Sequence, residues 1–213
     1  MTGEANSSAA MSSGYVLAGG GSTRFGRDKA LVEVGGKPML VRMCGLLRGA
    51  VSEVTVIGDP AKYASLGLSC AADRWPGGGP LGGIITALED AGARKESPEW
   101  NLIVSCDMPF LTPEWLAYLV GRATKSSSQV ALPESAHGPE PLCACYRTNA
   151  GPALRAAFEH GVRKITDALK QVTIEVLDEA DWKRFDSAGR LFWNMNTTVD
   201  FEEVCRVWEP ERE

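Results

Sequence analysis

A short apolar run, residues 14–18, passes directly into three successive glycines at 19–21. The run predicts a buried first strand, and the glycines leave no side chain where the chain departs from it. Glycines there allow positive φ angles and let a ligand lie against the backbone. The cations Arg24, Arg27 and Lys29 follow within one short loop. Because cations beside accessible backbone amides suit a polyphosphate, this segment predicts a nucleotide site.

Two familiar phosphate-binding motifs match this segment only in part. A Walker A loop requires a glycine, four further residues and then Gly-Lys-Ser/Thr, whereas Arg27 and Asp28 follow Gly26. A dinucleotide fingerprint requires a third glycine, and Arg24 occupies that position. A glycine-rich turn with solvated charges is the alternative for this segment taken alone, and the motifs further along the chain argue against it.

The chain has 213 residues, enough for one domain with a substantial core. Its 44% hydrophobic and 23% charged residues are typical of a soluble globular protein. No apolar run approaches the roughly 20 residues needed to cross a bilayer, and the net charge of −5 argues against a broad nucleic-acid surface. We therefore expect a cytoplasmic protein without membrane or nucleic-acid partners. Residues 1–13 are predicted to be a disordered tail, and residues 14–208 a single domain.

The six cysteines are scattered and form no Cys-x-x-Cys pair. Cys70, Cys106, Cys143 and Cys145 lie within apolar runs, where a cysteine is typically a small buried hydrophobe. The chain has only two histidines, neither close to a motif, so the sequence argues against a zinc site. This cysteine usage is typical of a reducing compartment.

Apolar runs alternate with helical patterns along most of the chain, which indicates right-handed βαβ units and a mainly parallel sheet. Ligands of such sheets bind beyond the carboxyl ends of the strands. The segments that this rule places on one rim are 17–29, 58–59, 73–83 and 107–110. Strands are predicted at 14–18, 53–57, 101–106, 129–132, 141–146 and 172–177, and helices at 38–48, 80–93, 113–124, 151–159 and 163–169.

Three later segments carry polar groups suited to a nucleotide and a metal. Asp73 opens a second glycine-rich loop, 73–83, and its carboxylate suits the donors of a base or sugar. Asp107 directly follows an apolar strand, and Mg²⁺ is usually bound by one or two carboxylates plus substrate phosphates. Asn194 and Asn196 are two apart on an extended segment, so their side chains point the same way. Each segment also has a plain structural explanation, as a tight turn, a cap or a partner for buried backbone.

Taken in order, these motifs resemble a known family. The first glycine loop, followed by Gly-Gly-Lys-Pro at 35–38, resembles the start of nucleotidyltransferases with a Rossmann-like fold. The further segments 73–83, 106–109, 140–142 and 194–197 make the chain most similar to molybdenum cofactor guanylyltransferases of the MobA type, over about residues 14–204. The resemblance implies a Rossmann-like three-layer α/β/α nucleotidyltransferase fold with a mainly parallel mixed sheet.

The resemblance also implies which residues meet the nucleotide. Leu17, Ala18, Gly19 and Gly20 would line it through their backbone, and Asp73 would contact the guanosine end.

For the phosphates, the resemblance implies that Lys29 reaches them and that Asp107 binds both the nucleotide and Mg²⁺. Arg24 and Lys29 would neutralise the pyrophosphate leaving group, and Asn196 is a candidate second metal ligand.

Two positions depart from the family pattern. The family uses a residue after the second strand, which falls at Gly58, so that contact is made by backbone or by Asp59. Glu140 stands where some relatives carry histidine or glutamine, and it receives no role.

The reaction implied is transfer of GMP from GTP to Mo-molybdopterin, giving the guanine dinucleotide cofactor and pyrophosphate. The attacking phosphate is already anionic, so no catalytic base is required, and positioning and charge stabilisation suffice. The alternatives are a cytidylyltransferase for the same cofactor, a sugar-phosphate nucleotidyltransferase, or a non-catalytic nucleotide-binding regulator. Gly19, where cytidylyl relatives carry alanine, leaves room for a purine and favours GTP. The partners implied besides the substrates are molybdopterin-insertion proteins and molybdoenzymes.

Overall fold

The computed structural model describes residues 12–19 and 28–208. A mixed central sheet organises the molecule, and its strands run parallel except for β9 and β8. This confirms the predicted fold class of a mainly parallel sheet. In order across the sheet the strands are β10 (Ile174–Leu177), β7 (Val130–Ser135), β9 (Cys143–Arg147), β6 (Trp100–Ser105), β1 (Ser12–Leu17), β4 (Glu53–Gly58) and β5 (Cys70–Ala72), with β8 (Gly138–Pro139) paired to β7.

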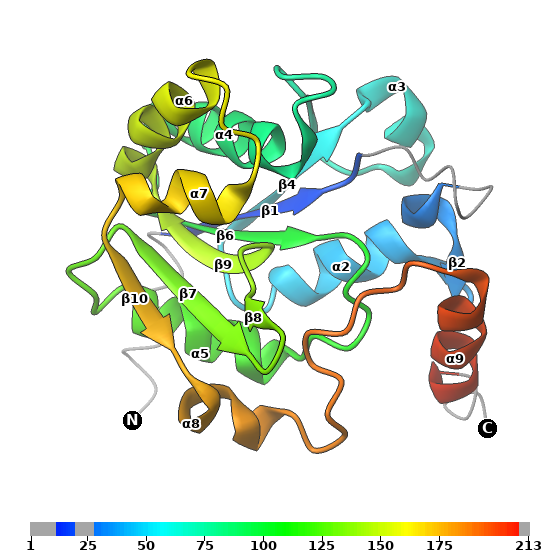
Figure 1. Ribbon diagram of the computed structural model, residues 1–213. Helices are drawn as coiled ribbons and strands as arrows, with labels where there is room; N and C mark the ends of the chain where they lie inside the picture. Colours follow the sequence, from blue (N-terminus) through cyan, green and yellow to red (C-terminus); the bar gives the residue numbers. More distant parts are fainter. Residues whose placement is uncertain (1–11, 20–27, 209–213) are drawn as a thin grey trace.

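Helices cover both faces of this sheet and complete three layers (Figure 1). Alternate residues of β1 point to opposite faces, so Tyr15 and Leu17 join one core and Val16 joins the other. The first core packs beneath α4 (Gly79–Gly92), α6 (Gly151–Glu159) and α7 (Ile165–Ala168). The second packs against α2 (Met39–Leu47), α5 (Pro113–Ala123), α8 (Glu179–Trp182) and α9 (Thr198–Trp208).

Most predicted elements lie within two residues of their observed bounds, because their apolar patterns are strong and local. Thr112 caps α5 as predicted, accepting a hydrogen bond from Trp115 N at 3.2 Å. The predicted boundary of the tail is corrected at one end: Ser12 and Ser13 belong to β1, where both are buried. Residues 1–11 lie outside the described residues. The elements that the sequence did not predict are β5, the hairpin β2 (Glu33–Val34) and β3 (Lys37–Pro38), β8, α3 (Pro60–Tyr63), α8 and α9.

The carboxyl ends of the parallel strands meet along one rim of the sheet. β1 pairs in parallel with both β4 and β6, so Leu17, Gly58 and Ser105 end together. β9 is antiparallel to both β6 and β7, so the end of β7 at Ser135 lies on the same rim. Among the described residues, no helix is both long and apolar enough to cross a membrane.

Candidate active site

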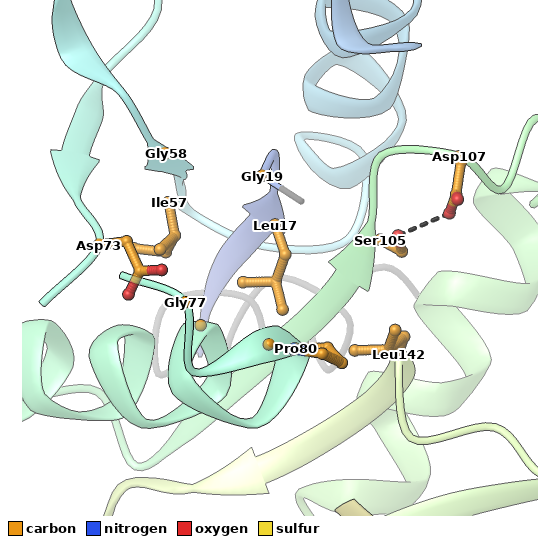
Figure 2. A pocket seen from close by; sticks show the side chains of 12 residues that line it. Leu17, Gly19, Ile57, Gly58, Asp73, Gly77, Pro80, Ser105, Asp107 and Leu142 are labelled. Atoms are coloured by element: carbon orange, nitrogen blue, oxygen red, sulfur yellow. Dashed lines mark hydrogen bonds between the residues drawn. The ribbon is translucent and has the colours of Figure 1, made fainter. Parts of the chain in front are cut away.

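A cavity of about 570 Å³ opens on this rim, above the ends of β1, β4 and β6 (Figure 2). Five of the residues that line it are glycines, from three separate segments: Gly19, Gly58, Gly77, Gly79 and Gly83. Glycine has no side chain to keep a ligand away, so much of the wall is backbone. Such a wall suits a flat base or a phosphate, which bind backbone N–H groups directly.

Gly58 makes the narrow approach between β1 and β4 possible. A Cβ built there would lie 2.4 Å from the carbonyl oxygen of Ala18 and 2.9 Å from the ring of Tyr63. Asp59, the alternative for a ligand contact, instead caps α3, accepting from the backbone N–H groups of Ala61 and Lys62. Of Gly58 and Asp59, it is Gly58 that lines the cavity, where its backbone can contact a ligand.

The first strand delivers Leu17 and Gly19 to the cavity wall. Ala18 between them is buried, and its N–H donates to Ile57 O at 2.9 Å. Its carbonyl oxygen lies 3.4 Å from the hydroxyl of Tyr63. Both polar backbone atoms of Ala18 have partners within the protein, and its predicted contact with the nucleotide stays a prediction.

Asp73 lies on the side of the cavity opposite Leu142, where β5 leads into the second glycine loop (Figure 2). Its Oδ1 accepts from Trp75 N at 2.9 Å and from the Thr86 hydroxyl at 3.0 Å. The Thr86 hydroxyl also accepts from Arg74 N at 3.1 Å, so the start of the loop is tied to α4. These contacts hold the carboxylate at the cavity wall in one orientation.

Lys29, Asp107 and Asn196 come together at the phosphate end predicted for the site. The Lys29 ammonium lies 3.1 Å from Asp107 Oδ2 and 2.7 Å from Asn196 Oδ1. Ser105 donates its hydroxyl hydrogen bond to Asp107 Oδ1 at 2.6 Å, and the Asp107 carbonyl accepts from Met195 N at 2.8 Å. Asp107 is thus oriented from β6 and from the C-terminal segment together.

The position of Lys29 depends on its neighbour Asp28, which caps the short 3-10 helix Lys29–Leu31. Asp28 Oδ1 accepts from Ala30 N at 3.0 Å, and its Oδ2 accepts from the Tyr63 hydroxyl at 3.0 Å and pairs with Lys62 at 2.6 Å. Burial acts to raise the pKa of Asp28, but these partners together hold it below its ordinary value. Tyr63 therefore contacts both flanks of the glycine loop, at Ala18 and at Asp28.

Sequence reasoning missed two of these residues. No local pattern marks Tyr63, whose role arises only when α3 folds back onto the end of β1. Ser105 carries a weak signal, because it ends the apolar strand two residues before Asp107. The predicted residues Gly20 and Arg24 lie outside the described residues.

Asp107 and Asn196 offer oxygens of the type that a divalent cation accepts. Both oxygens contact the Lys29 ammonium and therefore lie close to each other. Within residues 12–19 and 28–208, no group of three or more His, Cys, Asp or Glu side chains forms a metal site. Any ion bound here would therefore need oxygens from a ligand or water. The amide of Asn194 donates to Phe192 O at 3.2 Å, which is the backbone role that the sequence left open for it.

The buried cysteines are not prepared for nucleophilic attack. Burial raises the pKa of Cys106, and it raises that of Cys143 to about 12. Both thiols therefore stay protonated at neutral pH, and a protonated thiol is a weak nucleophile. Cys106, Cys143 and Cys145 are buried hydrophobes as predicted, whereas Cys70 is only partly buried.

Comparison with known proteins agrees with this geometry. Residues 14–173 match the family described as "MobA-like NTP transferase domain". A protein of Pelotomaculum thermopropionicum, named a probable molybdenum cofactor guanylyltransferase, is 33% identical over 93% of this chain and 94% of its own length. A protein of Deinococcus radiodurans with the same name is 35% identical over 89% of this chain and 91% of its own length.

The crystal structure of molybdopterin-guanine dinucleotide biosynthesis protein A from Archaeoglobus fulgidus is similar to this one with a TM-score of 0.77. The two are 25% identical, and the match covers 93% of this chain and 99% of that one. The resemblance expected from the motifs is confirmed, and the chain belongs to the family of MobA-like nucleotidyltransferases.

Proposed function

We propose that the protein transfers GMP from GTP to Mo-molybdopterin, releasing pyrophosphate and forming the guanine dinucleotide cofactor. The observation that carries this proposal is the convergence of Lys29, Asp107 and Asn196 at the end of a cavity walled by glycine backbone. The names carried by its relatives across almost the full chain support the same activity.

In this mechanism the nucleoside lies toward Asp73 and the phosphates lie toward Lys29. The backbone of Leu17, Gly19 and Gly20 lines the nucleotide, and the Asp73 carboxylate accepts from donors of the guanosine. Among the described residues other than its chain neighbours, no atom lies within 4 Å of the place where a Cβ on Gly19 would project, which leaves room for a purine. This favours GTP over CTP.

The chemical step is an in-line displacement at the α-phosphorus. A phosphate oxygen of molybdopterin forms the new bond, and the bond from the α-phosphorus to the bridging oxygen of pyrophosphate breaks. The nucleophile is already anionic, so no residue has to remove a proton. Lys29, together with Arg24, neutralises the charge that develops on the leaving pyrophosphate. The protein contributes mainly position and charge.

Mg²⁺ is the cofactor we propose, held by Asp107 with Asn196 as a second oxygen ligand. When bound it would stabilise the negative charge of the substrate phosphates. Ser105 keeps the Asp107 carboxylate turned toward this point, and Lys29 compensates its charge.

We further propose that residues 12–208 act as one nucleotidyltransferase domain and that it works in the cytoplasm. The thiols of Cys44, Cys70, Cys106, Cys143 and Cys145 are free, as a reducing compartment would leave them. Molybdopterin-insertion proteins and molybdoenzymes stay predicted partners.

The proposal is tested by incubating the full chain with Mo-molybdopterin, Mg²⁺ and one of GTP, CTP, UTP or ATP. We expect pyrophosphate and the dinucleotide cofactor with GTP, and far slower turnover with the other three. Preference for CTP would replace the guanylyl assignment by a cytidylyl one. Binding of GTP without any turnover in the presence of acceptor would favour the non-catalytic regulator.

A further inference from the structure

Tyr63, the last residue of α3, is buried between two segments that lead into the site, and only 2% of it is exposed. Its hydroxyl oxygen lies 3.0 Å from Asp28 Oδ2 and 3.4 Å from the carbonyl oxygen of Ala18. A phenol has one hydrogen to donate. The shorter distance and the charge of the carboxylate assign that hydrogen to Asp28. Tyr63 therefore reaches out of the core to hold a residue directly beside Lys29.

The protonation states of the two groups suit this hydrogen bond. Burial, and then the charge of Asp28, raise the pKa of Tyr63 above its ordinary value of 10.0, so the hydroxyl keeps its hydrogen at neutral pH. The hydrogen bond from Tyr63 is one of the interactions that hold the pKa of Asp28 below its ordinary value. At neutral pH the pair is thus a neutral phenol that donates and a charged carboxylate that accepts.

The two carboxylate oxygens of Asp28 have separate tasks. Oδ1 accepts from Ala30 N and so caps the 3-10 helix that begins at Lys29, while Oδ2 is held by Tyr63 and Lys62. The side chain of Lys62 is 47% exposed, and such a pair does little to fix an orientation because a long, solvated side chain is costly to immobilise. The buried hydroxyl of Tyr63 is the rigid partner. Without it, the carboxylate could follow Lys62 toward solvent and release the helix cap.

We propose that Tyr63 is a positioning residue for the β- and γ-phosphates of GTP, because through Asp28 it sets the direction in which Lys29 presents its ammonium. This inference rests on the proposed function, in which Lys29 meets these phosphates. The Lys29 side chain is 15% exposed and already lies 3.1 Å from Asp107 Oδ2, so a small shift of its helix changes what the ammonium can reach. Tyr63 itself contacts no substrate and takes no part in the chemical step.

The direct test compares the affinities of GTP and GMP, which share the guanosine and the α-phosphate, by calorimetry on the full chain. We expect the wild-type protein to bind GTP more tightly than GMP. Tyr63→Phe, which keeps the ring and removes the hydroxyl, should bind GMP as the wild type does and reduce the advantage of GTP over GMP by about 5-fold, the size of one hydrogen bond. A purely structural role would lower the amount of folded protein but leave the ratio of the two affinities unchanged.

The matched control is Tyr15→Phe. Tyr15 is also fully buried, and its hydroxyl also donates to a carboxylate, Asp90 Oδ2, at 2.8 Å. Asp90 lies near the C-terminal end of α4, whereas Gly79, at the start of that helix, lines the cavity. Tyr15→Phe therefore loses a similar hydrogen bond at a distance from the site. It should keep the full advantage of GTP over GMP, and circular dichroism melts report the stability of both variants.

A second variant tests the route through the carboxylate. Asp28→Ala removes the acceptor of the Tyr63 hydroxyl and should reduce the advantage of GTP over GMP at least as much as Tyr63→Phe does. If Tyr63 acts only through Asp28, adding Tyr63→Phe to Asp28→Ala should cause no further loss. Asp28→Ala alone still tests the inference if Tyr63→Phe fails to fold.

An undiminished advantage of GTP in folded Tyr63→Phe or Asp28→Ala would overturn the inference, as would additive losses in the double variant or an equal loss in Tyr15→Phe. Equal affinity of the wild type for GTP and GMP would overturn it as well. Normal GMP transfer by the wild type together with any of these results would reject the inference and keep the proposed function. Absence of GMP transfer by wild-type protein, with the expected loss in Tyr63→Phe, would reject the proposed function alone.

Discussion

Asp107 has three partners in the described part of the structure. Ser105, Lys29 and Met195 occupy its two carboxylate oxygens and its carbonyl, and the remaining direction faces the cavity. Its carboxylate is only 18% exposed, so its charge acts with little screening by water.

Asp107→Asn preserves the shape and removes the charge, and we expect kcat/KM to fall about 100-fold or more. GTP binding, which should tighten with Mg²⁺ in the wild-type protein, should lose that response in the variant. Titrating Mg²⁺ against GTP affinity by calorimetry checks this. An unchanged Mg²⁺ response would place the metal elsewhere.

Glu140 also makes a prediction about stability. Its pKa is raised by burial above the ordinary 4.5, so the folded state holds the proton more tightly than the unfolded state does. Ionisation therefore lowers stability as the pH rises from the ordinary pKa through this raised pKa. Glu140→Gln cannot ionise, so its Tm at pH 7 should equal or exceed that of the wild type, and the difference should shrink toward pH 4. Thermal melts of the wild type and of Glu140→Gln at both pH values test this, with Glu134→Gln as the exposed control. The argument would be refuted if Glu140→Gln lost more Tm relative to the wild type at pH 7 than at pH 4.

At the scale of elements, the site depends on how closely β1, β4 and α3 approach one another. Tyr63 on α3 reaches both Ala18 at the end of β1 and Asp28 before Lys29. The glycine at position 58 is what admits this packing, because any side chain would enter the same space.

Gly58→Ala should lower the free energy of unfolding by about 1–3 kcal/mol, as expected for overpacking against backbone. The contrasting variant is Gly45→Ala, on the exposed side of α2, where a Cβ meets nothing within 4 Å. It should raise the free energy of unfolding by about 0.5–1 kcal/mol, because glycine is a poor helix residue. Urea denaturation measures the free energy of unfolding of both variants. Equal changes in this free energy would show that the space around Gly58 is not crowded.

At the scale of the whole molecule, the C-terminal segment returns across the rim to complete the site. Asn196 meets Lys29 from 167 residues away, and it precedes α9, which packs against the β2–β3 hairpin. The matched family region ends at residue 173, before this segment begins. The backbone N–H groups of Asn196 and Thr197 are bound by Asp200, so the segment is anchored independently of the Asn196 amide.

Asn196→Ala should therefore leave the fold intact and lower kcat by about 10-fold or more, because Lys29 loses a charged hydrogen bond. The control is Glu202→Gln, an exposed position on α9. Steady-state kinetics with a circular dichroism melt separates the two effects. Normal turnover in Asn196→Ala would remove this residue from the site.

Local sequence was enough to locate the main strands, the glycine loops and the polar residues at strand ends. Residues 14–18 and 101–106 were predicted as buried strands because a short continuous apolar run of this length is typical of a buried strand. Lys29, Asp73 and Asp107 followed from the rule that ligands meet the carboxyl ends of parallel strands. Each of these inferences draws on neighbours within a few residues.

Tertiary structure alone decided which distant groups meet. The reversal of β9, the contact of Tyr63 with Asp28, and the contact of Asn196 with Lys29 leave no local pattern. The same holds for Glu140, whose burial depends on Ser135 and on a hairpin fastened to β6. Such contacts form only after the chain closes long loops, so their choice rests on the packing of the whole core and not on the residues beside them.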